Sequence, residues 1–444
     1  MEARIIRRSL VTIAVGLAMG SAGVAHATNG YFTHGYGTKA KGMGGVGMAI
    51  SQDAYAPGIN PAGIAGMETR FDGSLTYFRP ERSYEVSGMP TPPGAGTFGL
   101  APGKVDSESE DFFIPSVAFV QQIDEDRSWG VALLGNGGMN TDYPAFDNQF
   151  CPGPTGAGGL TPPTGTTGPF CDGAAGVNLE QLAIIPTYAQ KFADGRVSVG
   201  FSPIISYQRF SAEGLGTFGD MGMSEDPENL SSGKTDSTWG YGAQIGLQAE
   251  LAEGARIGAT YRSKIRAGDF DEYAGLFANG GDFDIPSTYG LGFSLDVSPN
   301  VTLSADYQMI RYSEIDAVSN PVSNIQQAQF GADGGPGFGW DDVNIFKLGA
   351  QIDGGNGWTW RVGYNRGENP ISSQNVTLNI LAPAVMEDHF TAGFTKEFGQ
   401  HELNFAAMYA PSQSVSGPNA FDPAQEVEIE MEQYELEIGY AYNF

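Results

Sequence analysis

Three basic side chains at alternate positions are the most suggestive chemical feature of this sequence: Arg262, Lys264 and Arg266. The chain carries 51 acidic against 23 basic residues, with a formal net charge of -28, so closely spaced cations are unusual in it. In a strand, residues two apart share one face. The three cations are therefore expected to face the same way and to bind the carboxylate of a ligand. The alternative is a structural network with carboxylates of the chain, such as Asp306, Glu435 or Glu437.

The two cysteines are the next candidates for chemistry. Cys151 and Cys171 bracket a stretch rich in Gly, Pro and Thr, and in an exported protein such a pair predicts a disulfide. The four histidines are scattered, no carboxylates have metal-ligand spacing, and there is neither a GxSxG elbow nor a Ser/His/Asp grouping. The sequence therefore predicts no metal, no cofactor and no enzymatic activity.

Export is predicted by the first 27 residues. A basic start is followed by an apolar run over 10–19 and by the small-x-small ending of Ala25 and Ala27, which is typical of a secretory signal peptide cleaved after Ala27. The apolar run is shorter than the roughly 20 residues of a spanning helix. No later stretch is apolar enough for one, so a membrane-embedded mature chain is expected to be a closed barrel.

Composition and alternation indicate the fold class. Gly contributes 64 of 444 residues, about twice the usual share of roughly 7%, which argues against helical bundles, while the acidic charge excludes nucleic acid as a partner. The last residues alternate strictly, with apolar side chains at every second position up to the terminal Phe444. Period two predicts a strand, and an aromatic-rich last strand ending in Phe is similar to the assembly signal of bacterial outer-membrane barrels.

The same alternation recurs along the chain. Fourteen segments are predicted as strands: 69–79, 111–123, 128–141, 178–193, 195–210, 236–251, 254–268, 286–297, 300–313, 340–353, 357–367, 387–398, 401–411 and 430–444. Short turns alternate with long connections at 80–110, 142–177, 211–235, 269–285, 314–339, 368–386 and 412–429. This pattern is typical of outer-membrane barrels, with long loops outside. Residues 69–444 are therefore predicted to form an all-β, transmembrane antiparallel β-barrel of about 14 strands.

The segment 28–68 is predicted to be a plug, because it is too rich in Gly for a regular element and too apolar for a solvated tail. Gly42, Gly44 and Gly47 match the spacing of the dinucleotide fingerprint GxGxxG, but no strand precedes them. Close packing of backbone inside another structure is the interpretation we favour for these glycines.

Several motifs resemble one family of outer-membrane proteins. The block from Lys41 to Asp53, followed by Asn60, Pro61 and Ala62, is similar to the N-terminal hatch of the FadL/TodX family, transporters of long-chain fatty acids and other hydrophobic compounds. Tyr261-Arg262-Ser263, Gly339-Trp340-Asp341-Asp342 and the run 358–364 are similar to further family landmarks, so the resemblance covers essentially the whole mature chain. It implies a fourteen-stranded barrel plugged by a hatch at 28–68, in which Asn60, Pro61 and Ala62 anchor the plug.

The resemblance also implies a route for substrate: capture between two outer loops, a pocket against the hatch, and lateral exit through the wall without ATP or proton coupling. Gly135, Gly137 and Gly138 interrupt the third strand and are the predicted lateral opening, with an ordinary bulge as the alternative. The third and fourth outer loops carry the predicted apolar groove, although these side chains could instead only pin the loops together. The groove residues are Leu215, Phe218, Met221, Met223, Leu230, Tyr273, Leu276 and Phe277.

Passive uptake of long-chain fatty acids across the outer membrane is the function expected from these features. Uptake of aromatic or aliphatic hydrocarbons by the same fold is the alternative, and it needs no basic contact in the pocket. An open porin and a purely structural surface protein are further alternatives, and the apolar plug argues against the porin. The expected partners are a hydrophobic small molecule, outer-membrane lipid and lipopolysaccharide, with no nucleic acid, and a monomer suffices.

Overall fold

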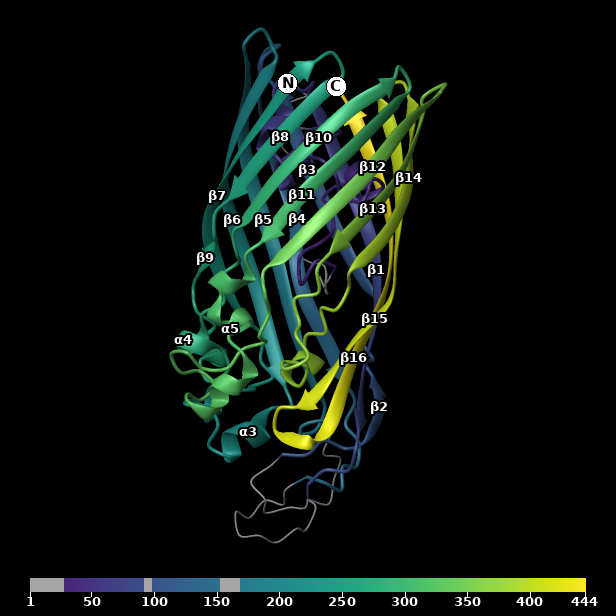
Figure 1. Ribbon diagram of the computed structural model, residues 1–444. Helices are drawn as coiled ribbons and strands as arrows, with labels where there is room; N and C mark the ends of the chain where they lie inside the picture. The colour runs from purple at the N-terminus through teal and green to yellow at the C-terminus, as the bar shows by residue number, and fades with distance from the viewer. Residues whose placement is uncertain (1–27, 92–97, 152–167) are drawn as a thin grey trace, which may run out of the picture.

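The protein forms a closed antiparallel barrel in the computed structural model, which describes residues 28–91, 98–151 and 168–444 (Figure 1). The predicted signal peptide lies outside the described residues. Fourteen strands follow one another around the wall in chain order, and pairing of the last with the first closes the sheet. The predicted fold class and strand number are therefore confirmed.

The wall strands alternate between short turns at one end and long loops at the other. Their bounds are β1 Arg70–Ser87, β3 Phe112–Gln122, β4 Arg127–Tyr143, β5 Ala175–Phe192, β6 Val197–Glu213, β7 Asp236–Ala252, β8 Ala255–Arg262, β10 Thr288–Ser298, β11 Val301–Ile310, β12 Val343–Gly355, β13 Trp358–Gly367, β14 Asp388–Phe398, β15 His401–Asn419 and β16 Asp422–Asn443. Two short strands, β2 (Gly103–Asp106) and β9 (Arg266–Ala267), pair with β1 and β7 outside this cycle.

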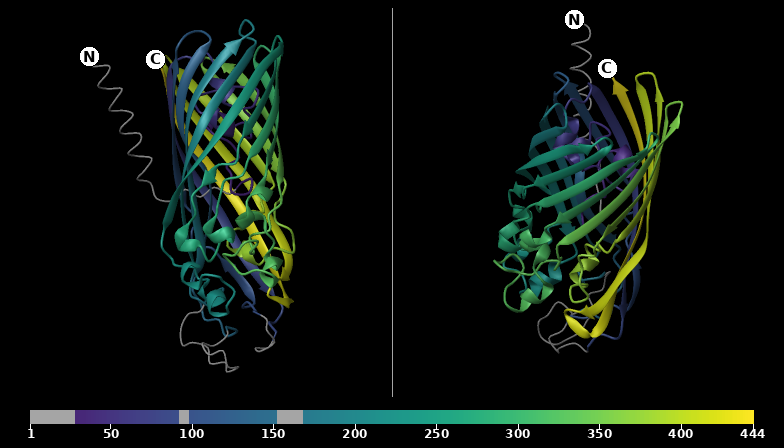
Figure 2. Two further views of the ribbon diagram at one scale, coloured as in Figure 1. Left: turned by 90° about the vertical axis from the view of Figure 1, so that its left-hand side faces the viewer. Right: turned by 45° about the horizontal axis from the view of Figure 1, so that its top comes forward.

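Short helices lie in the hatch and in the loops. The hatch contains α2 (Thr38–Lys41), η1 (Ala56–Gly58) and η2 (Pro61–Ile64). The loops contain α3 (Gly216–Asp220), η3 (Pro227–Asn229), η4 (Asp271–Tyr273), α4 (Ala278–Gly281), η5 (Tyr312–Glu314), α5 (Asp316–Ser319), η6 (Val322–Gln326) and η7 (Leu378–Ile380). Helices α3, α4 and α5 lie at the end of the barrel opposite the C-terminus (Figures 1 and 2). Among the described residues, no helix has the length and apolar character needed to cross a membrane.

The side chains of the wall are arranged inside out with respect to a water-soluble protein. On β16, Leu436 and Ile438 are exposed on the outer face, whereas the intervening Glu435 and Glu437 are buried in the lumen. Exposed aromatic rings such as those of Trp239 and Tyr409 lie on the same outer surface. A period-two strand places alternate residues on opposite faces, so the apolar outer face suits lipid and the polar face lines the interior.

Strands β1, β15 and β16 extend well beyond their predicted bounds, because polar alternation continues beyond the apolar segments. β1 and β16 stay paired as far as Ser87 and Glu426, and the predicted loop 412–429 is mostly a hairpin between β15 and β16. In that hairpin Val427 and Ile429 are buried, while the alternating Glu426, Glu428 and Glu430 lie on the opposite, outer face. Strands therefore extend past the apolar band, where water can solvate their outer face.

The hatch fills the lumen at the end where the turns lie (Figure 1). Residues 28–66 are almost all buried by strands from around the wall. Several inward-facing positions of the wall are glycines because the hatch backbone leaves no room for a Cβ: one added at Gly258 would lie 1.9 Å from the Met48 carbonyl oxygen, and one at Gly246 would lie 1.9 Å from the Asn60 side chain. Part of the high Gly content is therefore explained by wall-to-hatch packing.

Candidate functional site

An apolar pocket lies among the outer loops. Leu215, Phe218, Leu230, Leu276 and Phe277, five of the predicted groove residues, line it together. The remaining lining residues are Val177, Ala317, Phe330, Pro336, Gly337, Phe338, Leu378 and Leu381. No charged side chain lines this pocket. The chemistry of its lining suits an acyl chain or another apolar molecule, each buried methylene contributing about 0.8 kcal/mol.

Three predicted groove residues lie outside that pocket. Met221 is exposed, and Met223 packs, half-buried, against the apolar core. Tyr273 is buried, and its hydroxyl donates a 2.5 Å hydrogen bond to the Lys234 carbonyl, so it fixes one loop to another. The fifth and sixth outer loops, 314–339 and 368–386, contribute to the pocket but were not predicted. Their apolar residues were visible in the sequence, but only the fold brings these loops against the third and fourth.

A second cavity lies between the hatch and the wall. Arg262 and Lys347 both line it. The hatch contributes Phe32, Thr33, Gly35, Tyr36, Met48, Gly58 and Ile59, and the wall adds Gln244, Thr260, Thr288 and Gln308. Two buried cations therefore face a space enclosed by mostly neutral groups.

The neutral partners of Arg262 distinguish this cavity. Its guanidinium donates to the Asn136 amide oxygen at 2.9 Å, the Gly58 carbonyl at 2.9 Å and the Gln244 amide oxygen at 3.2 Å. No carboxylate of the described residues lies within ion-pair distance of Arg262. A carboxylate ligand would therefore be the first full negative charge at this site, where charge-assisted hydrogen bonds are strong.

Lys347 has similar surroundings. Its ammonium group donates to the carbonyl oxygens of His34, at 2.9 Å, and Gly45, at 3.4 Å. The carboxylate of Asp306, opposite Lys347 in the sheet, instead accepts hydrogen bonds from the Gly47 and Met48 backbone at 2.7 and 3.0 Å. Within the described chain Lys347 makes no ion pair. The sequence predicted that Lys347 faces inward, as Arg361 does, but it did not place Lys347 beside Arg262.

The structure does not bring the three predicted cations together. β8 ends at Arg262, so the alternation on which the prediction rested stops there. Lys264 forms a 2.7 Å ion pair with Asp284 in the following loop, and Arg266 is exposed. The expectation of a single basic face is wrong because Ser263 and Ile265 leave the regular ladder: Ile265 bridges to Ile285 instead. The carboxylates expected as partners, Asp306, Glu435 and Glu437, all bind the hatch.

On its other side the hatch is held by ion pairs. Lys41 lies 3.0 Å from Glu435 and 2.8 Å from Glu437, and Lys39 lies 2.6 Å from Glu402. Burial opposes the charge on Lys41, but the two carboxylates outweigh it and raise the pKa of Lys41 above its usual range. Buried charges are tolerated when they are paired and hydrogen-bonded, so these contacts anchor the plug.

Asp53 is a less favourable charge in the same region. Burial, reinforced by the neighbouring Asp72 carboxylate, raises the pKa of Asp53 to about 7. Its carboxyl accepts a 3.0 Å hydrogen bond from the Tyr55 backbone. A raised pKa favours the protonated form in the folded state, so this group contributes stability at low pH that is lost as pH rises through about 7.

The Asn60-Pro61-Ala62 motif lies at the contact between hatch and wall. The Asn60 amide donates to the carbonyls of Met48 at 2.8 Å and Leu247 at 3.0 Å, and its oxygen accepts from the Ala62 backbone at 3.0 Å. Asn60 therefore caps η2 and ties it both to the rest of the hatch and to β7.

The predicted lateral opening coincides with an unpaired part of the wall. β3 pairs with β1 from Phe112 onward but with β4 only from Val117, opposite Leu133. Beyond Leu133, β4 has a bulge between Gly135 and Gly137 in its pairing with β5. We call this region, between 112–116 of β3 and 134–140 of β4, the strand gap.

The hatch occupies the inner side of the strand gap. The Gly138 amide donates a 3.0 Å hydrogen bond to the Tyr31 carbonyl, and Phe32 bridges to Gly137. A Cβ at Gly137 would lie 2.2 Å from the Tyr31 carbonyl oxygen. The glycines of β4 therefore bind hatch backbone where β4 is not paired with β3, so displacement of residues 31–32 would leave the gap open.

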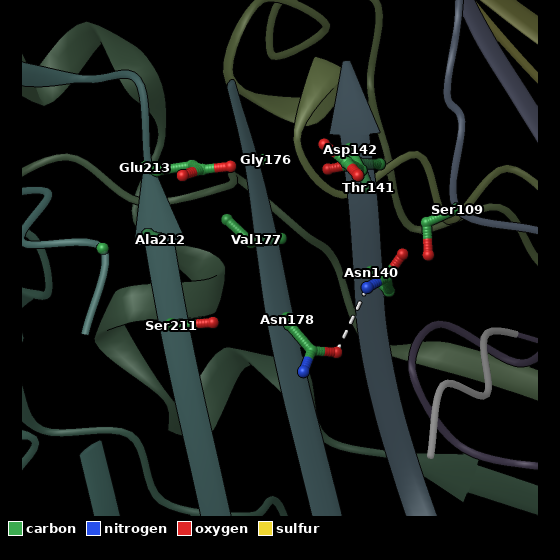
Figure 3. Close-up of a pocket in the computed structure, with 11 residues that line it drawn as sticks. Ser109, Asn140, Thr141, Asp142, Gly176, Val177, Asn178, Ser211, Ala212 and Glu213 are labelled. Carbon is green, nitrogen blue, oxygen red and sulfur yellow. Dashed lines mark hydrogen bonds between the residues drawn. The ribbon is translucent and has the colours of Figure 1, made fainter. Parts of the chain in front are cut away.

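Two features complete the loop end. A disulfide joins Cys151 to Cys171, with their Cα atoms 5.4 Å apart. A polar pocket at the ends of β4, β5 and β6 is shown in Figure 3, where Asn140 and Asn178 are hydrogen-bonded between adjacent strands. It is lined by Ser109, Asn140, Thr141, Asp142, Gly176, Val177, Asn178, Ser211, Ala212, Glu213 and Gly233. Its polar lining separates it from the apolar pocket, with which it shares Val177.

A closed barrel with an apolar outer face, a hatch in its lumen, an apolar pocket among its loops and a gap in its wall defines a plugged outer-membrane transport protein. The chain belongs to the family of outer membrane protein transport proteins (OMPP1/FadL/TodX), whose model matches residues 171–433.

Individual relatives are distant but match over nearly their whole length. The chain is 24% identical over 430 residues to a long-chain fatty acid transport protein of Salmonella typhi, covering 89% of each chain. Its fold is similar to that of the Pseudomonas putida toluene transporter TodX, with a TM-score of 0.66, 16% identity and coverage of 93% of this chain and 99% of that one. The Ralstonia pickettii toluene transporter TbuX gives a TM-score of 0.61 at 18% identity over 93% of this chain and 99% of that chain. These likenesses agree with the fold derived above.

Proposed function

We propose that this protein takes up long-chain fatty acids passively across the bacterial outer membrane. The observation that carries the proposal is the pair of buried cations, Arg262 and Lys347, facing one cavity with only neutral hydrogen-bond partners. A hydrocarbon carrier has no use for such a pair, whereas a fatty-acid carboxylate completes it.

The proposed route uses the three features in sequence. The acyl chain first enters the apolar pocket bounded by Phe218, Phe277 and Leu381. The carboxylate then binds Arg262 and Lys347 beside the hatch. Because Tyr31 and Phe32 lie between that cavity and the strand gap, their displacement connects the two. The chain leaves sideways, between β3 and β4, into the membrane, without coupling to ATP or protons.

The test is oleate binding to the purified barrel in detergent, measured by displacement of a fluorescent fatty acid. The double variant Arg262→Gln/Lys347→Gln should weaken binding by about tenfold or more, because each substitution removes a charge-assisted hydrogen bond. Arg266→Gln is the matched control, since it removes a positive charge from an exposed position outside the cavity. Wild-type affinity in the double variant would refute the carboxylate site.

Uptake of aromatic or aliphatic hydrocarbons is the second candidate. The uncharged lining of the outer pocket favours it, and two structural neighbours are toluene transporters. Toluene and oleate uptake by the same cells distinguish the candidates. If the double variant loses both substrates equally, or if the wild type carries only toluene, the fatty-acid assignment fails.

Export and assembly follow from the same proposal. Cleavage after Ala27 would begin the mature chain at Thr28, which is buried in the lumen with the rest of the hatch. The whole proposed route lies within one barrel, so a monomer embedded in outer-membrane lipid and lipopolysaccharide suffices. Amino-terminal sequencing of the outer-membrane form tests the cleavage site, and any terminus other than Thr28 contradicts it.

A further inference from the structure

One of the buried arginines outside the site described above, Arg82, has few hydrogen-bond partners. Arg70, Arg82, Arg262 and Arg361 are each at most 8% exposed, and all four project into the lumen. Arg70 pairs with Asp72 and Glu402, and Arg361 donates to Gln52, Gln351 and Thr395. Arg82 uses only one of its three nitrogens: Nη1 donates to the backbone carbonyl of Asn140 and, at 3.4 Å, to its amide oxygen.

The other two nitrogens of Arg82 have no partner among the described residues. Nε and Nη2 are both buried and without a hydrogen bond. The hydroxyl of Tyr143, which interacts electrostatically with the guanidinium, is likewise buried and unpartnered. A buried polar group normally finds a hydrogen-bond partner, so three unmatched donors in one place indicate a missing acceptor.

The surroundings of Arg82 suit an anion with an apolar tail. The guanidinium lies over the Phe112 ring, 5.7 Å from its centroid, and Tyr143 stacks edge-on against Tyr84 at 4.9 Å. Glu110 and Asp142 face Arg82 only at longer range: Glu110 pairs with Arg79 at 2.6 Å, and Asp142 is exposed. No carboxylate within the described chain is within ion-pair distance of Arg82.

Arg82 also lies at the extracellular edge of the strand gap. Its ring neighbour Phe112 is the first residue of β3, and its acceptor Asn140 lies on β4 beyond the last β3 pairing at Leu133. Arg82 is three residues past Arg79, which lies opposite the exposed ring of Tyr434. Exposed aromatic rings of this kind mark the membrane–water interface, so Arg82 lies at the level where a lipid carboxylate is solvated.

We propose that Arg82, together with the Tyr143 hydroxyl, binds the carboxylate of an amphipathic substrate at the edge of the strand gap while its acyl chain passes between β3 and β4. The inference rests on the proposed function, because it requires a substrate with an acidic head group. Arg82 would thus form a second binding site for the carboxylate, in addition to that of Arg262. This second site lies where the carboxylate returns to the membrane–water interface.

Two measurements test the Arg82 site: substrate uptake by whole cells and, in parallel, substrate binding by the purified barrel. Arg82→Gln should slow oleate uptake at least about fivefold, the loss expected when a charge-assisted hydrogen bond disappears. Toluene uptake and the oleate binding that depends on Arg262 should stay unchanged. Arg79→Gln is the matched control, because this neighbour on the same strand is partly exposed, points outward and pairs with Glu81 at 3.0 Å.

Two further variants keep the test decisive if Arg82→Gln folds poorly, which altered heat-dependent migration on a gel would reveal. Tyr143→Phe removes only the hydroxyl and should slow oleate uptake by a smaller factor, while Arg82→Lys should restore part of it. Wild-type oleate uptake in folded Arg82→Gln overturns the inference alone, as does an equal loss of toluene uptake. Absence of oleate binding by the wild-type protein overturns the proposed function itself.

Discussion

The two sides of the hatch hold their cations in opposite ways. Toward β15 and β16, Lys39 and Lys41 are matched by Glu402, Glu435 and Glu437 at ion-pair distance. Toward β8 and β12, Arg262 and Lys347 face a cavity and bind only neutral oxygens. All four cations are buried, but their roles differ. The cations paired with carboxylates fix the hatch in the barrel, whereas the cations without a carboxylate partner remain available to bind a ligand. We call the side facing β15 and β16 the anchored side, and the side facing β8 and β12 the open side.

Removing a cation from the anchored side should have the largest effect. Lys41→Met leaves Glu435 and Glu437 buried without their counter-charge, a loss of about 3–5 kcal/mol. We expect the hatch to detach, measured as increased proteolysis of the hatch and larger ion conductance in planar bilayers. Lys104→Met is the control, since its pair with Glu430 is largely exposed and worth at most about 1 kcal/mol. Wild-type conductance in Lys41→Met would show that the ion pairs do not anchor the plug.

The anchored side also contains one unfavourable charge, and pH should reveal it. With the pKa of Asp53 raised to about 7, the folded state binds a proton that the unfolded chain releases near pH 4. Stability contributed by protonated Asp53 is therefore complete below about pH 4 and lost as pH rises to about 7. Asp53→Asn should stabilise the protein above pH 7 by up to about 4 kcal/mol and flatten the pH dependence of urea unfolding.

Asp126→Asn, in an exposed turn, removes the same charge and is the control for that experiment. Equal pH dependence of unfolding in wild type and Asp53→Asn would contradict the assignment of this titration to Asp53.

Close packing on the open side can be tested without changing charge. Gly258→Ala places a methyl group 1.9 Å from the Met48 carbonyl oxygen, and overpacking of this kind costs about 1–3 kcal/mol. We expect a lower unfolding midpoint and weaker oleate binding, because Met48 lines the cavity. Gly73→Ala, where the nearest atom is the Phe71 ring at 3.4 Å, should be near wild type. Equal unfolding midpoints and equal oleate binding in the two variants would show that the hatch backbone can shift at this contact without cost.

The smallest effect on stability is expected from the cation of the open side. Arg262→Met leaves the Gln244 amide oxygen and the Gly58 carbonyl without this donor, a cost of about 1–3 kcal/mol for each. Removal of a buried, unpaired charge offsets that cost, so the variant should not release the hatch. Bilayer conductance and urea unfolding of this variant, compared directly with Lys41→Met, measure the asymmetry. If the conductance of Arg262→Met were as large as that of Lys41→Met, the cations of the two sides would contribute equally to holding the hatch, and the distinction between an anchored and an open side would be refuted.

Much of the fold could be predicted because its pattern is local. Alternation of apolar and polar residues along each strand is imposed by lipid on one side and lumen on the other, and it is visible segment by segment. It predicted fourteen strands, although the outward-facing glutamates at 426–432 concealed the extension of β16. The pairing of Cys151 with Cys171 was equally accessible, because the chain has only two cysteines.

The site was only partly accessible from the sequence. Five of the eight predicted groove residues share the apolar pocket, because apolar side chains in long loops are a local signal too. The prediction that Arg262, Lys264 and Arg266 share one face was wrong, because it assumed that one strand continues through Lys264. Lys347 was predicted only to face inward, and Arg82 was not predicted as a site residue, because the sequence does not show which neighbours surround a single cation.

The residue pattern alone thus established a barrel with a lipid-facing exterior, an apolar Gly-rich plug and apolar outer loops, since each depends on residues close together in the chain. Which cations are matched by carboxylates depends on contacts between positions hundreds of residues apart, such as Lys41 with Glu437 or Arg262 with Gly58. Those contacts exist only when the closed wall surrounds the hatch. The distinction between anchor and binding site is therefore a property of the tertiary structure.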